Sequence, residues 1–154
     1  MMNTKNFSTP TRRYKSLVSS IHSVYRLVNS TYELKDLVSR LSRLLCQLFD
    51  AQYSLILILD PSKKYSILKG LISDRKKCIL DKRLKIVNRL EKKIARKAIC
   101  VRQGSVLGVP LISDDIIGLV IVKRTRNHHP FDTFDQEMLM TLAEQAVIGI
   151  RNLQ

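Results

Sequence analysis

The chain has 154 residues, of which 45% are hydrophobic, and this is enough apolar material for one domain with a real core. Its 27 Lys and Arg residues outnumber its 13 Asp and Glu residues, so the formal net charge is +14. Because no apolar run approaches the roughly 18 residues of a membrane-spanning helix, and the polar start lacks the apolar core of a signal peptide, we expect a cytoplasmic protein without a transmembrane segment.

The start of the chain predicts a polar arm followed by a helix. Residues 1–12 are polar, and we expect them to be disordered. Over residues 13–30, four apolar residues recur with the spacing of a heptad seam: Leu17, Ile21, Val24 and Val28. Two heptads are short for a self-standing coiled coil, so this helix needs a partner. The residues leave two partners open, the domain's own sheet and a second copy in a dimer bundle.

Residues 31–154 are predicted to form the domain itself. Ser30-Thr31-Tyr32-Glu33 has the form of a capping box, which predicts that a second helix starts there. Its core-facing residues are Leu34, Leu37, Leu41, Leu44, Leu45 and Leu48. Residues 53–59 and 65–72 are β-rich runs joined by a Pro-containing turn, so they predict a hairpin.

The middle of the chain carries most of the positive charge. Residues 61–97 contain fourteen Lys and Arg against three acidic residues, which accounts for +11 of the net charge of +14. If residues 85–98 are helical, one face is apolar, with Val87, Leu90, Ile94 and Ala98. The opposite face is basic, and its residues are Lys85, Arg89, Lys92, Lys93, Arg96 and Lys97.

Three interpretations of this basic face remain open. It can be a solvated face that keeps the protein soluble, which is what charge runs on helices usually are. It can bind an acidic protein, a nucleic acid or an anionic membrane surface, because phosphate neutralisation gives affinity without sequence specificity. It can also hold an anionic small ligand. The chain has no Trp and no aromatic residues interleaved with the basic ones, so direct base readout is not supported.

The last third predicts a second hairpin and a long helix. Residues 106–112 and 116–122 are apolar at nearly every position, which indicates strands covered on both faces, and Ser113-Asp114-Asp115 forms the turn. Pro110 removes one backbone donor, so its strand should be bulged or lie at an edge. Thr133-Phe134-Asp135-Gln136 has the form of a capping box. The helix that follows carries an apolar stripe of Met138, Leu139, Leu142, Ala146, Ile150 and Leu153.

This arrangement resembles the GAF domain. The resemblance rests on the Val109-Pro110-Leu111 strand, the strand of residues 116–122, Phe131 with Asp135, and the apolar run that ends at Asp60. It covers roughly residues 34–153. It implies an α+β (α/β) fold with a central antiparallel sheet of five to six strands, helices on both faces, and N- and C-terminal helices packed together.

The resemblance also implies a role and an assembly. GAF domains are mostly sensory or regulatory modules of signal transduction and transcription control, and their flanking helices commonly pair across a homodimer. We therefore expect a non-catalytic domain whose dimer helices contribute Leu17, Ile21, Val24, Val28, Leu142, Ala146 and Ile150. The alternative is a degenerate GAF fold that uses its basic helix to bind an acidic partner or nucleic acid.

A ligand pocket would lie between the first hairpin and the Val-Pro-Leu strand. By resemblance, the candidates for contact with an anionic ligand are Arg89, Lys93, Cys100 and Arg102. The link of residues 100–104 is short for a lid that buries a small molecule, which lowers the expectation of ligand binding. The cyclic-nucleotide motif of the family survives only in Lys123, Phe131 and Asp135; Val122 and Gln136 replace its Asn and Glu. We expect Lys123 and Asp135 to form a structural ion pair.

The remaining candidates are cysteines and histidines. Cys46, Cys78 and Cys100 are widely spaced without a CxxC pair, so we expect packed, reduced thiols, no metal site and no cofactor. Cys100 falls near the reactive position of the free methionine sulfoxide reductases, which are GAF enzymes, and Arg102 could stabilise its thiolate. By resemblance, that enzyme surrounds its substrate with carboxylates near the Val-Pro-Leu strand and on the next strand. This chain has the apolar residues Leu107, Val120 and Val122 there, so a reductase is a remote alternative. His128-His129 is interpreted as a surface loop.

Overall fold

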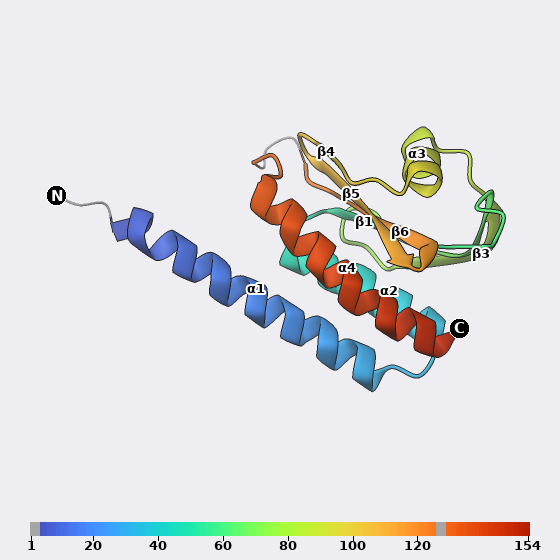
Figure 1. The fold of residues 1–154 in the computed structure, drawn as a ribbon, viewed down its shortest axis with the longest axis horizontal. Coiled ribbons are helices and arrows are strands. Elements are labelled where there is room, and N and C mark those ends of the chain that lie inside the picture. The colour runs from blue at the N-terminus through green and yellow to red at the C-terminus, as the bar shows by residue number, and fades with distance from the viewer. Residues whose placement is uncertain (1–3, 126–128) are drawn as a thin grey trace.

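The computed structural model describes residues 4–125 and 129–154 of the chain. These residues form four helices and six strands (Figure 1). The helices are α1 (Thr4–Ser30), α2 (Leu34–Leu48), α3 (Arg89–Lys97) and α4 (Thr133–Leu153). The strands are β1 (Tyr53–Leu59), β2 (Tyr65–Ile72), β3 (Ile79–Lys85), β4 (Val101–Gln103), β5 (Val106–Ser113) and β6 (Asp115–Lys123).

The strands form one sheet of six strands in the order β3-β2-β1-β6-β5-β4, and all of its pairs are antiparallel. Both predicted hairpins are confirmed, with β1 paired to β2 and β5 paired to β6. Central strands β1 and β6 bring the two hairpins together, and Ile56 of β1 stands opposite Val120 of β6.

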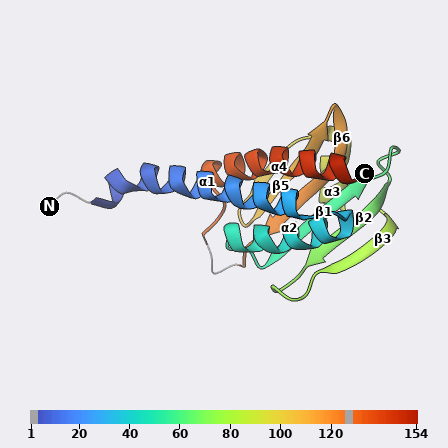
Figure 2. The ribbon, with the colours of Figure 1, turned by 90° about the horizontal axis from the view of Figure 1, so that it is seen from below.

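Helices cover both faces of the sheet, as the continuous apolar runs predict. Helices α1, α2 and α4 lie on one face and α3 lies on the other (Figures 1 and 2). Side chains alternate between the two cores, so that Ile56 and Ile58 of β1 face the three long helices while Leu55 and Leu57 face α3. The sheet is therefore buried from two sides, and the predicted packing of the N- and C-terminal helices together is confirmed.

Helix α1 is longer than expected. It begins at Thr4, within the segment that the sequence led us to expect as a disordered arm. The reason is cooperative: once the segment packed on the domain is helical, each further residue adds one hydrogen bond at low cost. Arg13 also ties α1 to the start of α4, because it donates to Asp132 at 3.0 Å and its guanidinium lies 5.0 Å from the centre of the Phe134 ring. The N-terminal part of α1 projects past the sheet (Figure 2).

Two predicted capping boxes are displaced. Glu33 is the residue before α2 and makes no side-chain cap, while the Thr31 hydroxyl donates to the Leu27 carbonyl at 2.6 Å and so closes the end of α1. At α4 the cap is Asp132, whose carboxylate accepts from the Asp135 amide at 2.9 Å, and Asp135 accepts from the Asp132 amide in return. Asp132 and Thr133 both have short side chains that can accept from an orphan amide, which is why the predicted cap of α4 was off by one residue.

Strand β3 was not predicted, and it shortens the expected helix over residues 85–98. None of its seven side chains is buried, and the sequence accordingly lacks the alternation of apolar and polar residues that would have predicted a strand. Its pairing with β2 places Lys85 opposite Tyr65. Lys85 is therefore the last residue of an edge strand and does not belong to the face of α3.

Pro110 lies in β5 opposite Leu119 of β6. Since β4 pairs only with residues 106–108 of β5, Pro110 lies beyond the end of β4, on an open stretch of edge. The pairing of β5 with β6 also shifts its register between Leu111 and Ile112. The predicted edge position of this proline is confirmed. None of the described helices is both long and apolar enough to cross a membrane.

Candidate functional site

Helix α3 is fixed at both of its ends. The Asn88 side chain accepts a hydrogen bond from the Glu91 amide at 3.1 Å and caps the first turn. Ala98 adopts the left-handed conformation, with φ of 52°, and its amide closes the last turn on the Ile94 carbonyl. An acid in the first turn and cations in the last turn suit the helix dipole. This short helix is thus a rigid platform for its side chains.

The inner side of α3 lies directly on the sheet. Ile94 and Ala95 are buried against the face formed by β1, β5 and β6. A Cβ atom on Gly108 of β5 would come within 2.6 Å of the Ile94 Cδ1 atom, so the helix approaches the strand closely. Ile94 therefore occupies the space above Gly108 in which a small molecule held between α3 and this part of the sheet would have to fit.

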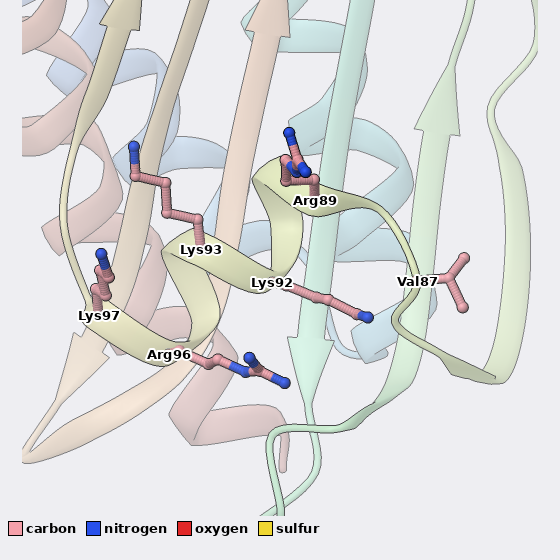
Figure 3. A pocket seen from close by; sticks show the side chains of 6 residues that line it. All are labelled: Val87, Arg89, Lys92, Lys93, Arg96 and Lys97. Carbon is pink, nitrogen blue, oxygen red and sulfur yellow. The ribbon is translucent and has the colours of Figure 1, made fainter.

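The outer side of α3 is basic, as predicted, with the exception of Lys85. We call Arg89, Lys92, Lys93, Arg96 and Lys97 the α3 face. Together with Val87 they line an open depression of about 450 Å³ (Figure 3). In the described part of the chain, none of these five cations forms an ion pair. The α3 face is therefore a concentrated positive surface without carboxylates bound to it.

Two further depressions flank the helix. One, of about 280 Å³, lies toward the turn between β1 and β2 and is lined by Lys63, Lys64, Lys85, Ile86, Lys92 and Arg96. The other, of about 440 Å³, lies toward β4 and β5 and is lined by Asn88, Arg89, Leu90, Lys93, Val101, Gln103 and Val106. Lys63 and Lys64 were not among the predicted site residues, because their closeness to α3 comes from the sheet and has no local signal in the sequence.

Arg89 and Lys93 do not share a pocket with Cys100 and Arg102. Arg102 of β4 reaches the start of α4, where it donates to the Gln136 side chain at 3.0 Å and to the Phe131 carbonyl at 3.3 Å. Cys100 packs with the core under α1, α2 and α4. The four predicted ligand contacts are therefore divided between opposite faces of the sheet, and the single pocket expected from them is wrong.

Cys100 lacks the surroundings of a reactive thiol. Burial raises the pKa of the Cys100 thiol, which disfavours the nucleophilic thiolate. Its neighbours in a groove of about 290 Å³ are mainly apolar: Pro110, Ile112, Met140, Ala143, Glu144 and Val147. Arg102 is bound to the start of α4, so the expectation that it stabilises a Cys100 thiolate is not supported. Burial likewise raises the pKa of the Cys46 thiol.

A half-buried polar cluster lies beneath the start of α3. The side chain of Glu91 faces the sheet and is 6% exposed. Burial raises the pKa of Glu91, while the charges of Lys69 and Lys123 act in the opposite direction. The Lys123 ammonium lies 4.4 Å from the centre of the Tyr53 ring. Burial, and next the Glu91 charge, raise the pKa of Tyr53. Because a single acid within a basic segment gives no pattern, sequence reasoning missed this cluster.

Lys123 does not pair with Asp135, which corrects a second prediction. The partner of Asp135 is Arg124, at 3.5 Å, and this pair is largely shielded from solvent. Arg124 also donates to the Phe49 carbonyl at 2.8 Å and lies 4.1 Å from the centre of the Phe131 ring. Side chains alternate along β6, so Lys123 faces α3 whereas its neighbour in the chain reaches α4. Phe131 and Asp135 therefore hold the start of α4.

The residues predicted to form the dimer contact pack against the core of their own chain instead. Val24, Leu142, Ala146 and Ile150 are at most 2% exposed. Leu17, Ile21 and Val28 pack against the same core. In this arrangement the four buried residues are not available to a dimer contact, and the three others are only partly exposed, because α1 packs on α4 and α2 through them. From residue 12 onward, where the side chains of α1 are described, the large apolar side chains that the helix leaves exposed are Tyr14, Val18 and Tyr25.

The predicted surface loop at His128-His129 is only partly described. His128 lies outside the described residues, and His129 is exposed. Within the described ranges, no group of three or more His, Cys, Asp or Glu side chains is placed to hold a metal ion.

A sequence model of the GAF domain matches residues 31–151, so the chain belongs to the GAF domain family. Comparison with curated proteins finds no match. Among solved structures, the GAF domain of a phosphoenolpyruvate-protein phosphotransferase from Coxiella burnetii is 15% identical, with a TM-score of 0.70 over 90% of this chain and 94% of that one. A putative GAF sensor protein from Burkholderia vietnamiensis is 14% identical, with a TM-score of 0.71 over 92% of this chain and 94% of that one.

The fold is also shared with an enzyme. Free methionine-R-sulfoxide reductase from Neisseria meningitidis, solved in complex with its substrate, is 14% identical, with a TM-score of 0.67 over 89% of each chain. At such identities these structures show the fold alone. The GAF fold is typical of sensory and regulatory domains, and what this chain binds has to be argued from its own residues.

Proposed function

We propose that this chain is a non-catalytic regulatory GAF domain that binds an anionic ligand or acidic partner on its α3 face and transmits the event through α4 and α1. The observation that carries the proposal is the α3 face itself. Its five cations lie on one side of a capped helix, and none of them forms an ion pair with a described residue. Surface charges of one sign raise the local concentration of an opposite charge and speed its association. The setting that suits such a module is signal transduction or transcription control.

The surroundings of Cys100 support the non-catalytic part of this proposal. The closest chemistry in the family is sulfoxide reduction by a thiolate, and burial disfavours the Cys100 thiolate. The apolar groove around Cys100 supplies only Glu144 as a charged group. A substrate with a charged amino group and a charged carboxylate would leave at least one of those charges unpaired there.

A continuous packed route connects the α3 face to the terminal helices. Ile94 of α3 contacts β5 at Gly108. On its other face β5 packs on α4 through Leu107, Val109 and Leu111. Farther along α4, Gly149 lies against Val28 of α1. Because packed layers move together, an anion that shifts α3 on the sheet changes the α1–α4 contact.

A homodimer through α1 is the second part of the proposal. Tyr14, Val18 and Tyr25 lie on one side of α1, and Tyr14 and Tyr25 are 69% and 57% exposed. These three side chains widen the apolar stripe of α1 that packs on the core, and an exposed apolar flank of this kind is suited to a second helical partner. Helix α1 also projects past the sheet, which leaves its free side accessible to another copy (Figure 2).

The test is thermal unfolding of the domain against cyclic nucleotides, amino acids, nucleotides, acidic peptides and short DNA and RNA duplexes, at low and moderate salt. We expect a gain in melting temperature with anions, because a ligand that binds only the folded state stabilises it. Charge reversal of Lys92 and Arg96 on α3 should abolish the gain. Reversal of Lys35 and Arg40 on α2, at the opposite face, is the matched control and should preserve it. A gain with a neutral ligand that ignores the α3 reversal would overturn the proposal.

A further inference from the structure

The depression beside the turn between β1 and β2 is built differently from the outer α3 face. We call it the hairpin cleft; its lining residues are Lys63, Lys64, Lys85, Ile86, Lys92 and Arg96. Its cations come from three separate segments, namely the turn after β1, the end of β3, and α3. In Figure 3, Lys92 and Arg96 extend from the same side of α3 toward the end of β1, whereas Arg89 and Lys93 extend toward the other side.

Backbone hydrogen bonds hold the cleft in shape without any ligand. The Ile86 amide donates to the Lys64 carbonyl at 2.9 Å, which fixes the end of β3 against the turn and sets Lys85 beside Lys64. Within the turn, the Lys63 amide donates to the Asp60 carbonyl at 3.0 Å, and the Ser62 hydroxyl donates to the Asp60 carboxylate at 2.7 Å. Ile86 is buried and forms an apolar floor. The cations are therefore brought together by a rigid backbone.

The carboxylates nearby do not neutralise the cleft. Asp115 pairs with Lys63 at 2.7 Å and is exposed at the outer rim. The pKa of Asp60 is lowered, mainly by the hydrogen bond from the Ser62 hydroxyl and next by backbone amides of the turn. The Asp60 carboxylate therefore stabilises the turn. Glu91 of α3 faces the sheet. Lys64, Lys85, Lys92 and Arg96 form no ion pair with the described residues, so an anion that binds among them would relieve their mutual repulsion.

We propose that the hairpin cleft binds a polyphosphate group, either as free inorganic polyphosphate or as the phosphate tail of a nucleotide. Several linked phosphates place several negative charges within a few ångströms of one another, which matches four unpaired cations around one cleft. Lysine acts as a point charge toward phosphate oxygens, and the Arg96 guanidinium can bind two of them at once. The lining offers no aromatic ring and no carboxylate, so it recognises phosphate and leaves a base unread. This inference rests on the proposed function, because it names the anion that the α3 region binds.

The test is calorimetric titration of the protein with inorganic tripolyphosphate at constant ionic strength. We expect saturable binding that is much tighter than that of orthophosphate or sulfate, which carry fewer charges. A nucleoside triphosphate distinguishes the two sources: equal affinity indicates that the phosphates alone are bound, and tighter binding of the nucleotide indicates a nucleotide tail. Perturbed NMR amide signals should cluster at Lys64, Lys85 and Ile86.

Two matched variants decide the location. The double variant Lys64→Glu/Lys85→Glu changes the cleft, and Arg89→Glu/Lys93→Glu makes the same charge change on the other side of α3. We expect the first to weaken tripolyphosphate binding by about tenfold or more and the second by only a small factor, because charges farther than about 8 Å are screened at physiological ionic strength. Circular dichroism verifies folding, and Lys64→Gln/Lys85→Gln gives the same answer without introduced repulsion.

The outcomes separate this inference from the proposed function. Equal weakening by both double variants would overturn the cleft and leave a general α3 anion surface. Absence of tripolyphosphate binding, with a nucleic acid duplex or acidic peptide still bound, would also overturn the cleft and leave the proposed function with a macromolecular partner. If no anion binds at all, both are wrong.

Discussion

Ile94 of α3 and Gly108 of β5 are in close contact: a Cβ atom on Gly108 would lie 2.6 Å from the Ile94 Cδ1 atom. This contact is what seats α3 on the sheet. Ile94→Ala should therefore lower the free energy of unfolding by about 2–5 kcal/mol, the usual cost of a cavity left by a large buried aliphatic side chain. Urea unfolding followed by circular dichroism measures it. Val87→Ala, at an exposed position beside the same helix, is the control, and an equally small loss in both variants would show that Ile94 does not anchor α3.

The contact between Val28 of α1 and Gly149 of α4 gives a second prediction. A Cβ atom on Gly149 would lie 2.7 Å from the Val28 Cγ1 atom, so Gly149→Ala forces the two helices apart. Alanine favours the helix by roughly 1 kcal/mol over glycine, while overpacking costs about 1–3 kcal/mol, and we expect a small net loss of stability. Gly149→Ala should cost less stability in a Val28→Ala background than in the wild type, because the smaller side chain leaves room for the added methyl group. An equal cost in both backgrounds would show that the two residues are not in steric contact.

Glu91 predicts a pH dependence of stability. Burial raises the pKa of Glu91 in the folded protein above its ordinary value of 4.5, so between that value and the raised one the folded state holds more protons than the unfolded state. Stability should then fall as the pH rises through this window. Glu91→Gln removes the effect, so its stability relative to the wild type should grow with pH through the window and then level off.

Denaturant unfolding from pH 4 to 8 measures this difference. Glu137→Gln, at an exposed position on α4, is the control and should show no such trend. A difference between Glu91→Gln and the wild type that is constant with pH would contradict the role assigned to the buried carboxyl group.

The sequence predicted the fold well where apolar runs were long. Residues 53–59 and 65–72 emerged as β1 and β2 with the predicted bounds, because an apolar run flanked by a Pro-containing turn has few other solutions. Strand β3 was missed because its side chains are all at least partly exposed, and such an edge strand is defined by pairing with β2, which is not a local property.

The candidate site was predicted only in part. The α3 face follows from helical spacing, so Arg89, Lys92, Lys93, Arg96 and Lys97 were found together. The placement of Lys64 beside Lys85 depends on the register of β2 with β3 and on the Ile86 amide bonded to the Lys64 carbonyl. The predicted ion pair between Lys123 and Asp135 was wrong for a similar reason. Lys123 ends β6 on the α3 side of the sheet, and the next residue, Arg124, reaches Asp135 on the other side.

Cys100 provides a test of the non-catalytic proposal. Since burial raises the pKa of its thiol and the groove around it is mainly apolar, we expect the wild-type protein to reduce free methionine-R-sulfoxide no faster than a reaction without protein. The assay measures methionine formation with a thiol reductant, and a known free methionine sulfoxide reductase shows that the assay works. Turnover by the wild type that is lost in Cys100→Ser would make the protein an enzyme.

The exposed side of α1 gives the last prediction. Val18 is 48% exposed and lies with Tyr14 and Tyr25 on the exposed flank of α1, beside the stripe that packs on the core, so Val18→Glu should dissociate the proposed dimer without unfolding the chain. Light scattering at micromolar concentration measures the mass, and circular dichroism verifies the fold. Ile21→Glu serves as the contrast, because Ile21 packs against the core, and its replacement should lower the melting temperature. A wild-type protein that is monomeric, or a dimer that survives Val18→Glu, would show that α1 does not form the interface.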